Sequence, residues 1–159
     1  MPELPEVETI VADLQPGLTG VRILGAEVRH PAIVRHPEPR LFEAGVRGRV
    51  IERLTRRGKY ILMQLDDSQL LVVHLGMSGQ LRLVDPGLPL EPHTHAVFTL
   101  SSGRQLRYRD VRRFGRLLLG TEAELLRLRA LPRLGPEPLD TAFRPADLYR
   151  RLQHRRAPL

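Results

Sequence analysis

Short apolar runs separated by turn signals fill most of this chain. Asp66-Asp67-Ser68 joins two runs rich in Ile, Leu and Val as the turn of a hairpin would, and Ser101-Ser102-Gly103 joins another pair. The proline-rich stretch 85–92 indicates an exposed loop. Many short strands are typical of antiparallel sandwiches and barrels. We therefore predict a two-layer antiparallel β-sandwich, or flattened barrel, with strands at residues 21–29, 46–56, 60–66, 69–75, 79–84, 95–101, 104–109 and 114–119.

An apolar stripe near the start of the chain consists of Val7, Ile10, Val11 and Leu14. Positions i, i+3, i+4 and i+7 share one face of a helix, so we predict an N-terminal amphipathic helix over about residues 5–15. Gly17 and Gly20 are expected to end it. Helical patterns at 121–129 and 145–156 predict a C-terminal helical segment. The predicted fold class is thus mainly β with flanking helices.

Composition limits the function classes. A length of 159 residues suits one domain with a substantial core. The formal charge of +7 indicates an anionic partner, of which nucleic acid is the commonest for a basic domain. There is no run apolar enough for a membrane span and no signal-peptide pattern, so we expect a cytoplasmic protein with no membrane partner. The absence of cysteine excludes a disulfide and a thiolate metal site, and we expect no metal or cofactor in this chain.

The chain begins Met1-Pro2-Glu3, and removal of Met1 would leave a secondary amine at its start. An α-amino group has a pKa near 8, so an appreciable neutral fraction exists at pH 7. Such an amine could attack a carbonyl-like carbon and form an iminium ion, with Glu3 as a proton carrier. Proline followed by glutamate is also an ordinary way to begin a helix. The opening residues alone do not decide between these interpretations.

Lys59 is the only lysine in a chain rich in arginine. Arginine stays protonated in proteins, whereas an amine can shift its pKa and exchange protons. This contrast predicts that Lys59 takes part in chemistry. A lysine without a chemical role, retained by chance on a solvated strand, explains the single lysine about as well.

Arginine is concentrated in two segments. Residues 104–116 contain six arginines against Asp110, and residues 144–156 contain five against Asp147. Clusters of this kind are usually solvated faces. Two of them in a basic protein favour a surface that follows the phosphates of a nucleic acid.

Two expected loops carry apolar side chains next to glycine or arginine. Met77 lies between Gly76 and Ser78-Gly79, and Phe114 follows two arginines. Such residues are more often part of a core. On a basic surface, however, they are the type that proteins insert between the base steps of a kinked duplex.

The opening Pro2-Glu3-Leu4-Pro5-Glu6-Val7-Glu8-Thr9 resembles that of the bacterial formamidopyrimidine-DNA glycosylases of the MutM type. The resemblance continues through Arg57-Gly58-Lys59-Tyr60, His74-Leu75-Gly76-Met77-Ser78-Gly79, His93-Thr94-His95, Asp110 to Gly115, and Leu134-Gly135-Pro136-Glu137-Pro138-Leu139. The related endonuclease VIII branch usually opens Pro-Glu-Gly-Pro-Glu, so Leu4 favours the MutM side. These motifs are ordered and distributed over the whole chain.

The resemblance implies roles for individual residues. It makes Pro2 the nucleophile at the sugar C1′, Glu3 its general acid/base partner and Lys59 a second catalytic amine that contacts phosphate. It assigns DNA contacts to His93, Arg112, Arg155, His74 and Glu6. It also makes Met77, Arg112 and Phe114 the wedge that fills the void left by an extruded base, with Arg112 facing the orphaned partner base.

The implied activity is excision of oxidised purines (8-oxoguanine and formamidopyrimidines) from double-stranded DNA, followed by strand cleavage by β,δ-elimination through a Schiff base. The implied partner is DNA with oxidised or abasic sites, bound by a monomer. The family continues past the point matched by Leu159 with a helix-two-turn-helix domain and a four-cysteine zinc finger. Residues 1–159 would then be a single N-terminal catalytic domain with weak or no activity by itself. The lesion preference stays open.

Two alternatives remain at this stage. The first is a non-catalytic basic DNA-binding module, which would bind in a salt-dependent way and form no covalent adduct. The second is an unrelated enzyme that uses an N-terminal proline as a general base on small keto acids.

Overall fold

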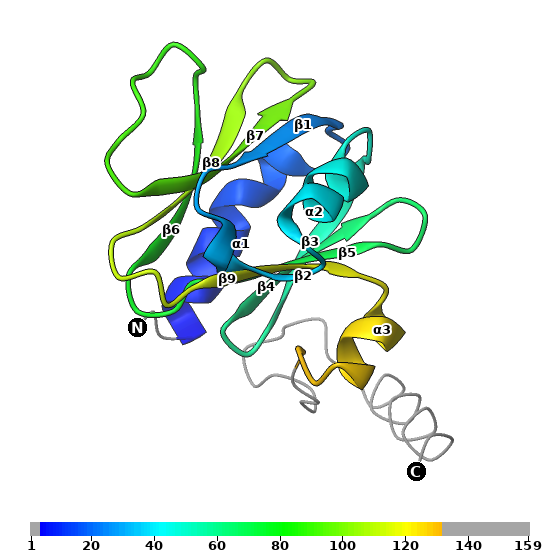
Figure 1. Cartoon of the computed structure of the whole chain (residues 1–159). Coiled ribbons are helices and arrows are strands. Elements are labelled where there is room, and N and C mark those ends of the chain that lie inside the picture. The colour runs from blue at the N-terminus through cyan, green and yellow to red at the C-terminus, as the bar shows by residue number, and fades with distance from the viewer. Residues whose placement is uncertain (1–3, 132–159) are drawn as a thin grey trace.

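The computed structural model describes residues 4–131, which form two β-sheets with helices at their sides (Figure 1). The four-stranded sheet has the order β1-β7-β8-β6, and all its neighbours are antiparallel. Its strands are β1 (Ile23–Val28), β7 (Thr94–Leu100), β8 (Gln105–Asp110) and β6 (Gly79–Val84). The 66–68 and 101–103 turns lie between paired antiparallel strands, as the turn signals predict.

The five-stranded sheet has the order β2-β9-β5-β4-β3. Its strands are β2 (Val34–His36), β9 (Arg116–Gly120), β5 (Leu70–His74), β4 (Tyr60–Leu65) and β3 (Ile51–Arg57). The short strand β2 pairs with β9 in parallel, so this sheet is mixed. Both sheets are open at their edges, which makes the fold a sandwich and not a closed barrel.

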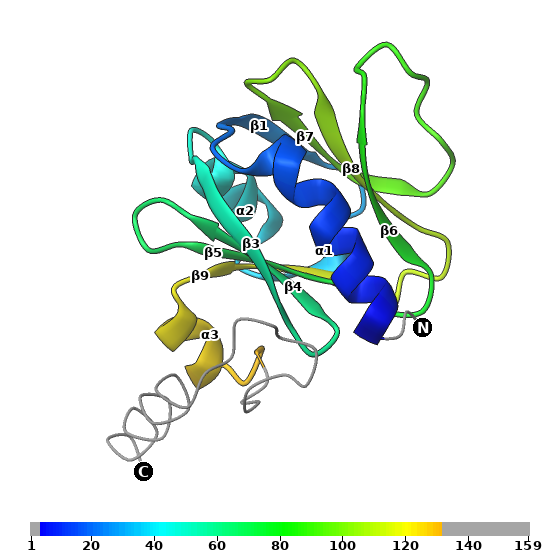
Figure 2. The same ribbon diagram turned by 180° about the vertical axis from the view of Figure 1, so that it is seen from behind.

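Two helices cover the open sides of the sandwich. Helix α1 (Leu4–Leu18) contacts the edge strands β3 and β6, and α2 (Pro39–Val46) contacts the edge strands β1 and β2. Figures 1 and 2 show them on opposite sides of the molecule. An uncovered sheet edge exposes unpaired amide and carbonyl groups, and the helices shield these edges from other chains.

The core lies between the sheets and is sealed by these helices. The apolar stripe of α1 enters it, since Val7, Val11 and Leu14 are buried as predicted. The strands contribute alternate residues, for example Ile61 and Met63 from β4. Burying a large apolar side chain stabilises the fold by roughly 1.5–3 kcal/mol, so the buried stripe is sufficient to keep α1 packed against the sheets.

A second apolar cluster covers the outer face of the five-stranded sheet. It consists of Leu62, Leu70, Val72, Leu118, Leu125 and Leu131. Leu125 comes from α3 (Glu122–Arg127), which begins at Thr121 with a capping box completed by Glu124. This short helix confirms the beginning of the predicted 121–129 segment. The predicted helix at 145–156 lies outside the described residues.

The sequence prediction fails in the region before β3. Residues 39–46 form α2, so the predicted strand 46–56 begins only at Ile51. Phe42 and Val46 are one helical turn apart and both fully buried, and Pro39 stands in the first turn, where its missing amide costs little. Tertiary burial of two side chains therefore stabilises a helix whose pattern is too short to predict.

Two other boundaries differ from the prediction. Helix α1 continues past Gln15 to Leu18, because Leu18 extends the buried stripe by one turn, and the helix ends before Gly20 at φ +81°. Pro16 is accommodated in this last turn. Strand β9 begins at Arg116, so Phe114 belongs to the preceding loop and not to a strand.

Candidate functional site

Three strand connections meet at one end of the five-stranded sheet. The register pairs Tyr60 with His74 and His74 with Arg116, so the starts of β4 and β9 and the finish of β5 lie side by side. We call this the loop end. It carries the β3–β4 turn with Lys59 and two longer connections, residues 75–78 and 111–115, which we call the paired loops. The first turn of α1 lies at the same end (Figure 2).

Asp110 holds the paired loops together. It is fully buried, and its carboxylate accepts hydrogen bonds from the Ser78 hydroxyl at 2.6 Å, the Tyr108 hydroxyl at 2.7 Å and the Gly115 amide at 2.8 Å. The Arg112 amide donates in turn to Ser78 Oγ at 3.0 Å. Burial alone would raise the pKa of Asp110, but the hydrogen bonds that it accepts lower this pKa below its usual value. The ionised carboxylate thus fixes one arrangement of both loops.

The paired loops also touch through two glycines. A Cβ at Gly76, which has φ +62°, would lie 2.6 Å from the amide nitrogen of Gly115. A Cβ at Gly115 would collide with the Tyr108 hydroxyl and lie 2.9 Å from an Asp110 carboxylate oxygen. The close approach of the loops therefore requires glycine at both positions.

The side chains of Met77 and Phe114 project from the paired loops into solvent. The two residues are 47% and 55% exposed, so neither belongs to the core. The Arg112 guanidinium lies 3.9 Å from the Met77 sulfur. The structure thus brings the three predicted wedge residues together on two loops that are held by one buried carboxylate.

Carboxylates neutralise only some of the arginines at the loop end. Arg56 and Arg57, where β3 ends, pair with carboxylates. Within residues 4–131, none of Arg112, Arg113 and Arg116 forms an ion pair. These three side chains keep positive charge on and next to the paired loops, which favours an anionic partner there.

The arginine-rich segment 104–116 does not form one continuous surface. Arg107 is buried, and its guanidinium donates to the carbonyls of Leu88 and Pro89. Arg109 donates to the Pro92 carbonyl at 2.9 Å and pairs with Glu91. These two side chains fasten the predicted loop 85–92 over the outer face of the four-stranded sheet. A hollow of about 400 Å³ lies between that loop and the sheet.

His74 lies between Tyr60 and Arg116 in the row across the strands. Its ring is 4.6 Å from that of Tyr60, and its Nδ1 accepts a hydrogen bond from the Gly76 amide at 3.2 Å. Burial, and then the charges of Arg116 and Lys59, lower its pKa. A neutral ring that accepts at Nδ1 carries its proton on Nε2, so His74 offers a donor there.

His93 and His95 lie beside the second loop. The exposed His93 has φ +68°, and its carbonyl accepts from the Asp110 amide at 3.0 Å. The buried His95 ring bonds through Nε2 to the Asp110 carbonyl at 2.7 Å and contacts the His30 ring at 5.1 Å. The Arg113 guanidinium lies 3.5 Å from His30 Nε2. His93 is thus placed next to the paired loops.

The catalytic residues that the resemblance implies are only partly described. Pro2, Glu3 and Arg155 lie outside the described residues. Glu6 is exposed on the first turn of α1, and Lys59 is half-buried at the β3–β4 turn. An ion pair connects α1 to β3 close to that turn, since Glu8 lies 2.6 Å from Arg56. The structure thus places Lys59 at the same end as the start of α1.

The residues that sequence reasoning missed are the ones that organise the loops. Asp110 received no role, nor did Ser78, Tyr108 and His95. A signal was available for one of them. Leu106, Tyr108 and Asp110 alternate along β8 toward the core. A carboxylate at a core-facing position is rare unless it is bonded, and this marks Asp110 as an organising residue.

Residues 4–131 contain no group of three or more potential ligands among His, Asp and Glu that could hold a metal ion, and the sequence has no cysteine. None of the helices in this range is long and apolar enough to cross a membrane.

The chain is similar in sequence to proteins of a known family. Residues 1–117 match the family described as formamidopyrimidine-DNA glycosylase N-terminal domain. A formamidopyrimidine-DNA glycosylase of Moorella thermoacetica is 49% identical over all of this chain and 58% of its own length. One of Desulforamulus reducens is 46% identical over 98% of this chain and 57% of its own length. The chain therefore spans somewhat more than half the length of the curated relatives it matches.

Solved structures agree with this match. The Lactococcus lactis enzyme in complex with FAPY-dG-containing DNA superposes with a TM-score of 0.77 at 34% identity, covering 86% of this chain and 51% of the other. Its complex with abasic-site DNA gives a TM-score of 0.78 at 33% identity, covering 87% and 51%. Sequence and fold together show that the chain belongs to the formamidopyrimidine-DNA glycosylase family, in the part that corresponds to its N-terminal domain.

Proposed function

We propose that this chain is the catalytic N-terminal part of a DNA repair glycosylase and AP lyase that acts on oxidised purines and abasic sites in double-stranded DNA. The observation that carries the proposal is the pair of loops held by Asp110, which exposes Met77, Arg112 and Phe114 together. The DNA-bound relatives support the choice of partner. We also propose that the protein acts as a monomer in the cytoplasm.

The paired loops have the chemistry needed to stabilise an extruded nucleotide. A base inside a duplex cannot be reached by a nucleophile and must be rotated out, at a cost of a few kcal/mol. Met77 and Phe114 would enter the gap and restore stacking contacts, while Arg112 would donate to the orphaned base. Because Asp110 fixes both loops before DNA arrives, little ordering entropy remains to be lost on binding.

The chemistry is assigned to the first residues. The neutral Pro2 nitrogen attacks C1′ of the extruded nucleotide, the bond from C1′ to the base breaks, and Glu3 supplies a proton on the path of ring opening. The resulting iminium ion acidifies the C2′ proton. Loss of that proton expels the 3′ phosphate, and a second elimination expels the 5′ phosphate. Lys59, at the same end as the start of α1, would exchange protons and contact a phosphate during these steps.

The sequence has no cysteine, so it cannot supply the ligands of the family's four-cysteine zinc finger. We therefore assign the finger to the portion of the relatives that the chain does not match. None of the steps above uses it.

Borohydride trapping tests the proposal. The chain with Met1 removed is incubated with a duplex that contains an abasic site and reduced with borohydride. We expect a covalent adduct whose yield falls strongly in Pro2→Gly, because a primary amine replaces the secondary amine of proline. Pro5→Gly is the matched control, since it alters a nearby proline and leaves the N-terminal amine in place.

Two outcomes would contradict the proposal. An adduct that forms at the parent's yield in Pro2→Gly would place the nucleophile at another residue. Salt-dependent binding without any adduct would favour the non-catalytic DNA-binding module.

A further inference from the structure

A row of side chains crosses the outer face of the five-stranded sheet at the loop end. Tyr60, His74 and Arg116 are paired across β4, β5 and β9. Each is two residues from a member of the outer apolar cluster, as Arg116 is from Leu118, so all three project on that side of the sheet. The row therefore continues the outer apolar face toward the paired loops.

Arg116 is unusual among the arginines of residues 4–131. Its Nε is buried and has no hydrogen-bond partner, and its guanidinium forms no ion pair with a described residue. A buried donor without an acceptor is unfavourable and is rare in native proteins. The described residues thus supply no hydrogen-bond acceptor for this nitrogen.

His74 adds a second donor beside Arg116. Its Nδ1 accepts from Gly76, which leaves the proton on Nε2, and the ring is one strand away from Arg116. Lys59 is next to Tyr60 in the sequence and adds positive charge that His74 senses. Of the described carboxylates, Glu122 pairs with Arg57, and Asp110 is bonded to the paired loops. Two donors thus lie side by side in a positive field, and no described carboxylate forms an ion pair with Arg116.

We propose that Arg116 is a further DNA-binding residue, which together with His74 binds a phosphodiester of the strand that passes over the loop end. The proposal rests on the proposed function and names an additional contact at the same site. An arginine fork matches two phosphate oxygens, and a neutral histidine can still donate to a third. Because Nε is buried, the phosphate would bind the two terminal nitrogens of the guanidinium, which are not among the buried unpartnered atoms.

The salt dependence of DNA binding tests this assignment. Affinity for a duplex containing an abasic-site analogue is measured over a series of salt concentrations for the parent chain, Arg116→Met and Arg104→Met. Losing one phosphate contact lowers the slope of log K against log salt by about 0.9. We expect that change for Arg116→Met only, because the exposed Arg104 lies at the opposite end of β8 and carries the same charge. Arg116→Lys should keep part of the slope, since it retains the charge without the guanidinium fork.

Equal slopes for the parent and Arg116→Met would overturn the proposal, and so would an equal decrease for both methionine variants. A second readout does not depend on DNA binding. Inorganic phosphate should shift the NMR resonances of Arg116 Nε and His74 Nε2, and Arg116→Met should remove the shift at His74. Failure of the proposed function would appear as a missing borohydride adduct with these phosphate shifts intact, whereas an absence of shifts would refute the Arg116 site itself.

Discussion

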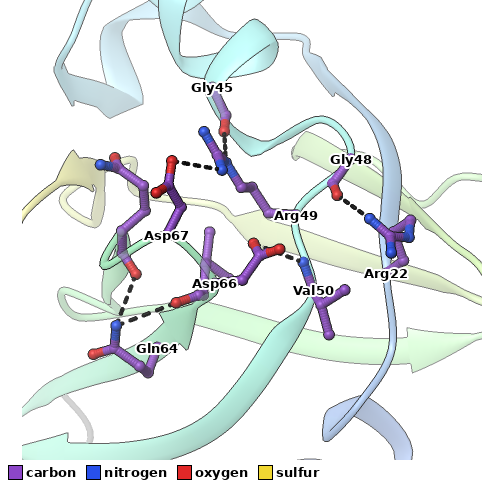
Figure 3. Close-up of polar contacts among 10 residues, drawn as sticks. Arg22, Gly45, Gly48, Arg49, Val50, Gln64, Asp66 and Asp67 are labelled. Atoms are coloured by element: carbon purple, nitrogen blue, oxygen red, sulfur yellow. Dashed lines mark hydrogen bonds and ion pairs between the residues drawn. The ribbon is translucent and has the colours of Figure 1, made fainter.

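The two ends of the five-stranded sheet use arginine in different ways. At the end opposite the paired loops, Arg49 pairs with Asp67 at 3.1 Å and donates to the Gly45 carbonyl, and Arg22 donates to the Gly48 carbonyl (Figure 3). At the loop end, Arg56 and Arg57 are ion-paired as well, whereas the guanidinium groups of Arg112 and Arg116 have no carboxylate or carbonyl partner among the described residues. Arginine content alone therefore does not locate a binding surface. The loop end differs in that its unpaired arginines lie on or next to the paired loops, which expose Met77 and Phe114.

The two ends differ in their carboxylates as well. The Asp66 carboxylate accepts from the Val50 amide at 3.1 Å, whereas the buried Asp110 carboxylate accepts from two hydroxyl groups and from the backbone of the second paired loop. The Asp66 carboxylate bonds one amide 16 residues away, whereas the Asp110 carboxylate ties two loops that are 32 residues apart in the sequence. The comparison predicts that stability at the loop end depends on Asp110 far more than the opposite end depends on Asp66.

The largest expected effect is therefore that of Asp110→Ala. It leaves the Tyr108 and Ser78 hydroxyls and the Gly115 amide without their acceptor, which should cost about 3–5 kcal/mol of the free energy of unfolding. Asp66→Ala, the matched change at the other end, should cost only about 1 kcal/mol. Urea denaturation measures both. Similar losses for the two variants would show that Asp110 is an ordinary turn residue.

A smaller loss is expected when a methyl group is added between the paired loops. Gly115→Ala places a Cβ against Tyr108 and the His74 carbonyl, and such overpacking costs roughly 1–3 kcal/mol. Gly87→Ala is the control, because a Cβ there meets nothing within 4 Å. Thermal unfolding should separate the two variants. If Gly115→Ala unfolds at the parent's temperature, the loops are not in the close contact described.

The dependence of stability on pH should also distinguish Asp110. Its folded-state pKa is lower than its usual value, so its contribution is fully present above the unfolded pKa of about 3.9 and is lost as pH falls through the folded pKa. Unfolding free energies of the parent should therefore decrease in the acidic range, and Asp110→Asn should reduce that slope. Urea titrations at a series of pH values test this, with Asp66→Asn as the comparison from the other end. Parallel curves for the parent and Asp110→Asn would contradict the assignment.

These differences also explain how far the sequence could predict the structure. The strands from β4 to β8 follow from local turn signals and alternation, and the α1 stripe follows from its spacing. Helix α2 does not, because tertiary contacts stabilise it: Phe42 and Val46 are buried, and Glu43 accepts a hydrogen bond from the Val28 amide. The motifs locate the paired loops, but the bond between Ser78 and Asp110 depends on β6 and β8 being neighbours in the sheet. Likewise, only the structure shows which arginines of residues 104–116 bind the loop 85–92 and which lie on the paired loops.

The smallest expected effects are those of single arginines at the surface, and they should be opposite at the two ends. Arg49→Met removes a surface ion pair and should cost about 0.2–1 kcal/mol in stability while leaving DNA affinity unchanged. Arg112→Met removes no ion pair among the described residues, so its stability should stay within about 0.5 kcal/mol of the parent. Its affinity for a duplex with an abasic-site analogue should fall, because the wedge loses its charged member. Paired measurements of urea unfolding and DNA affinity on both variants test this crossing pattern. If Arg112→Met lost stability and kept its affinity, the unpartnered arginine would be a structural residue, and the difference between the two ends would lose its functional meaning.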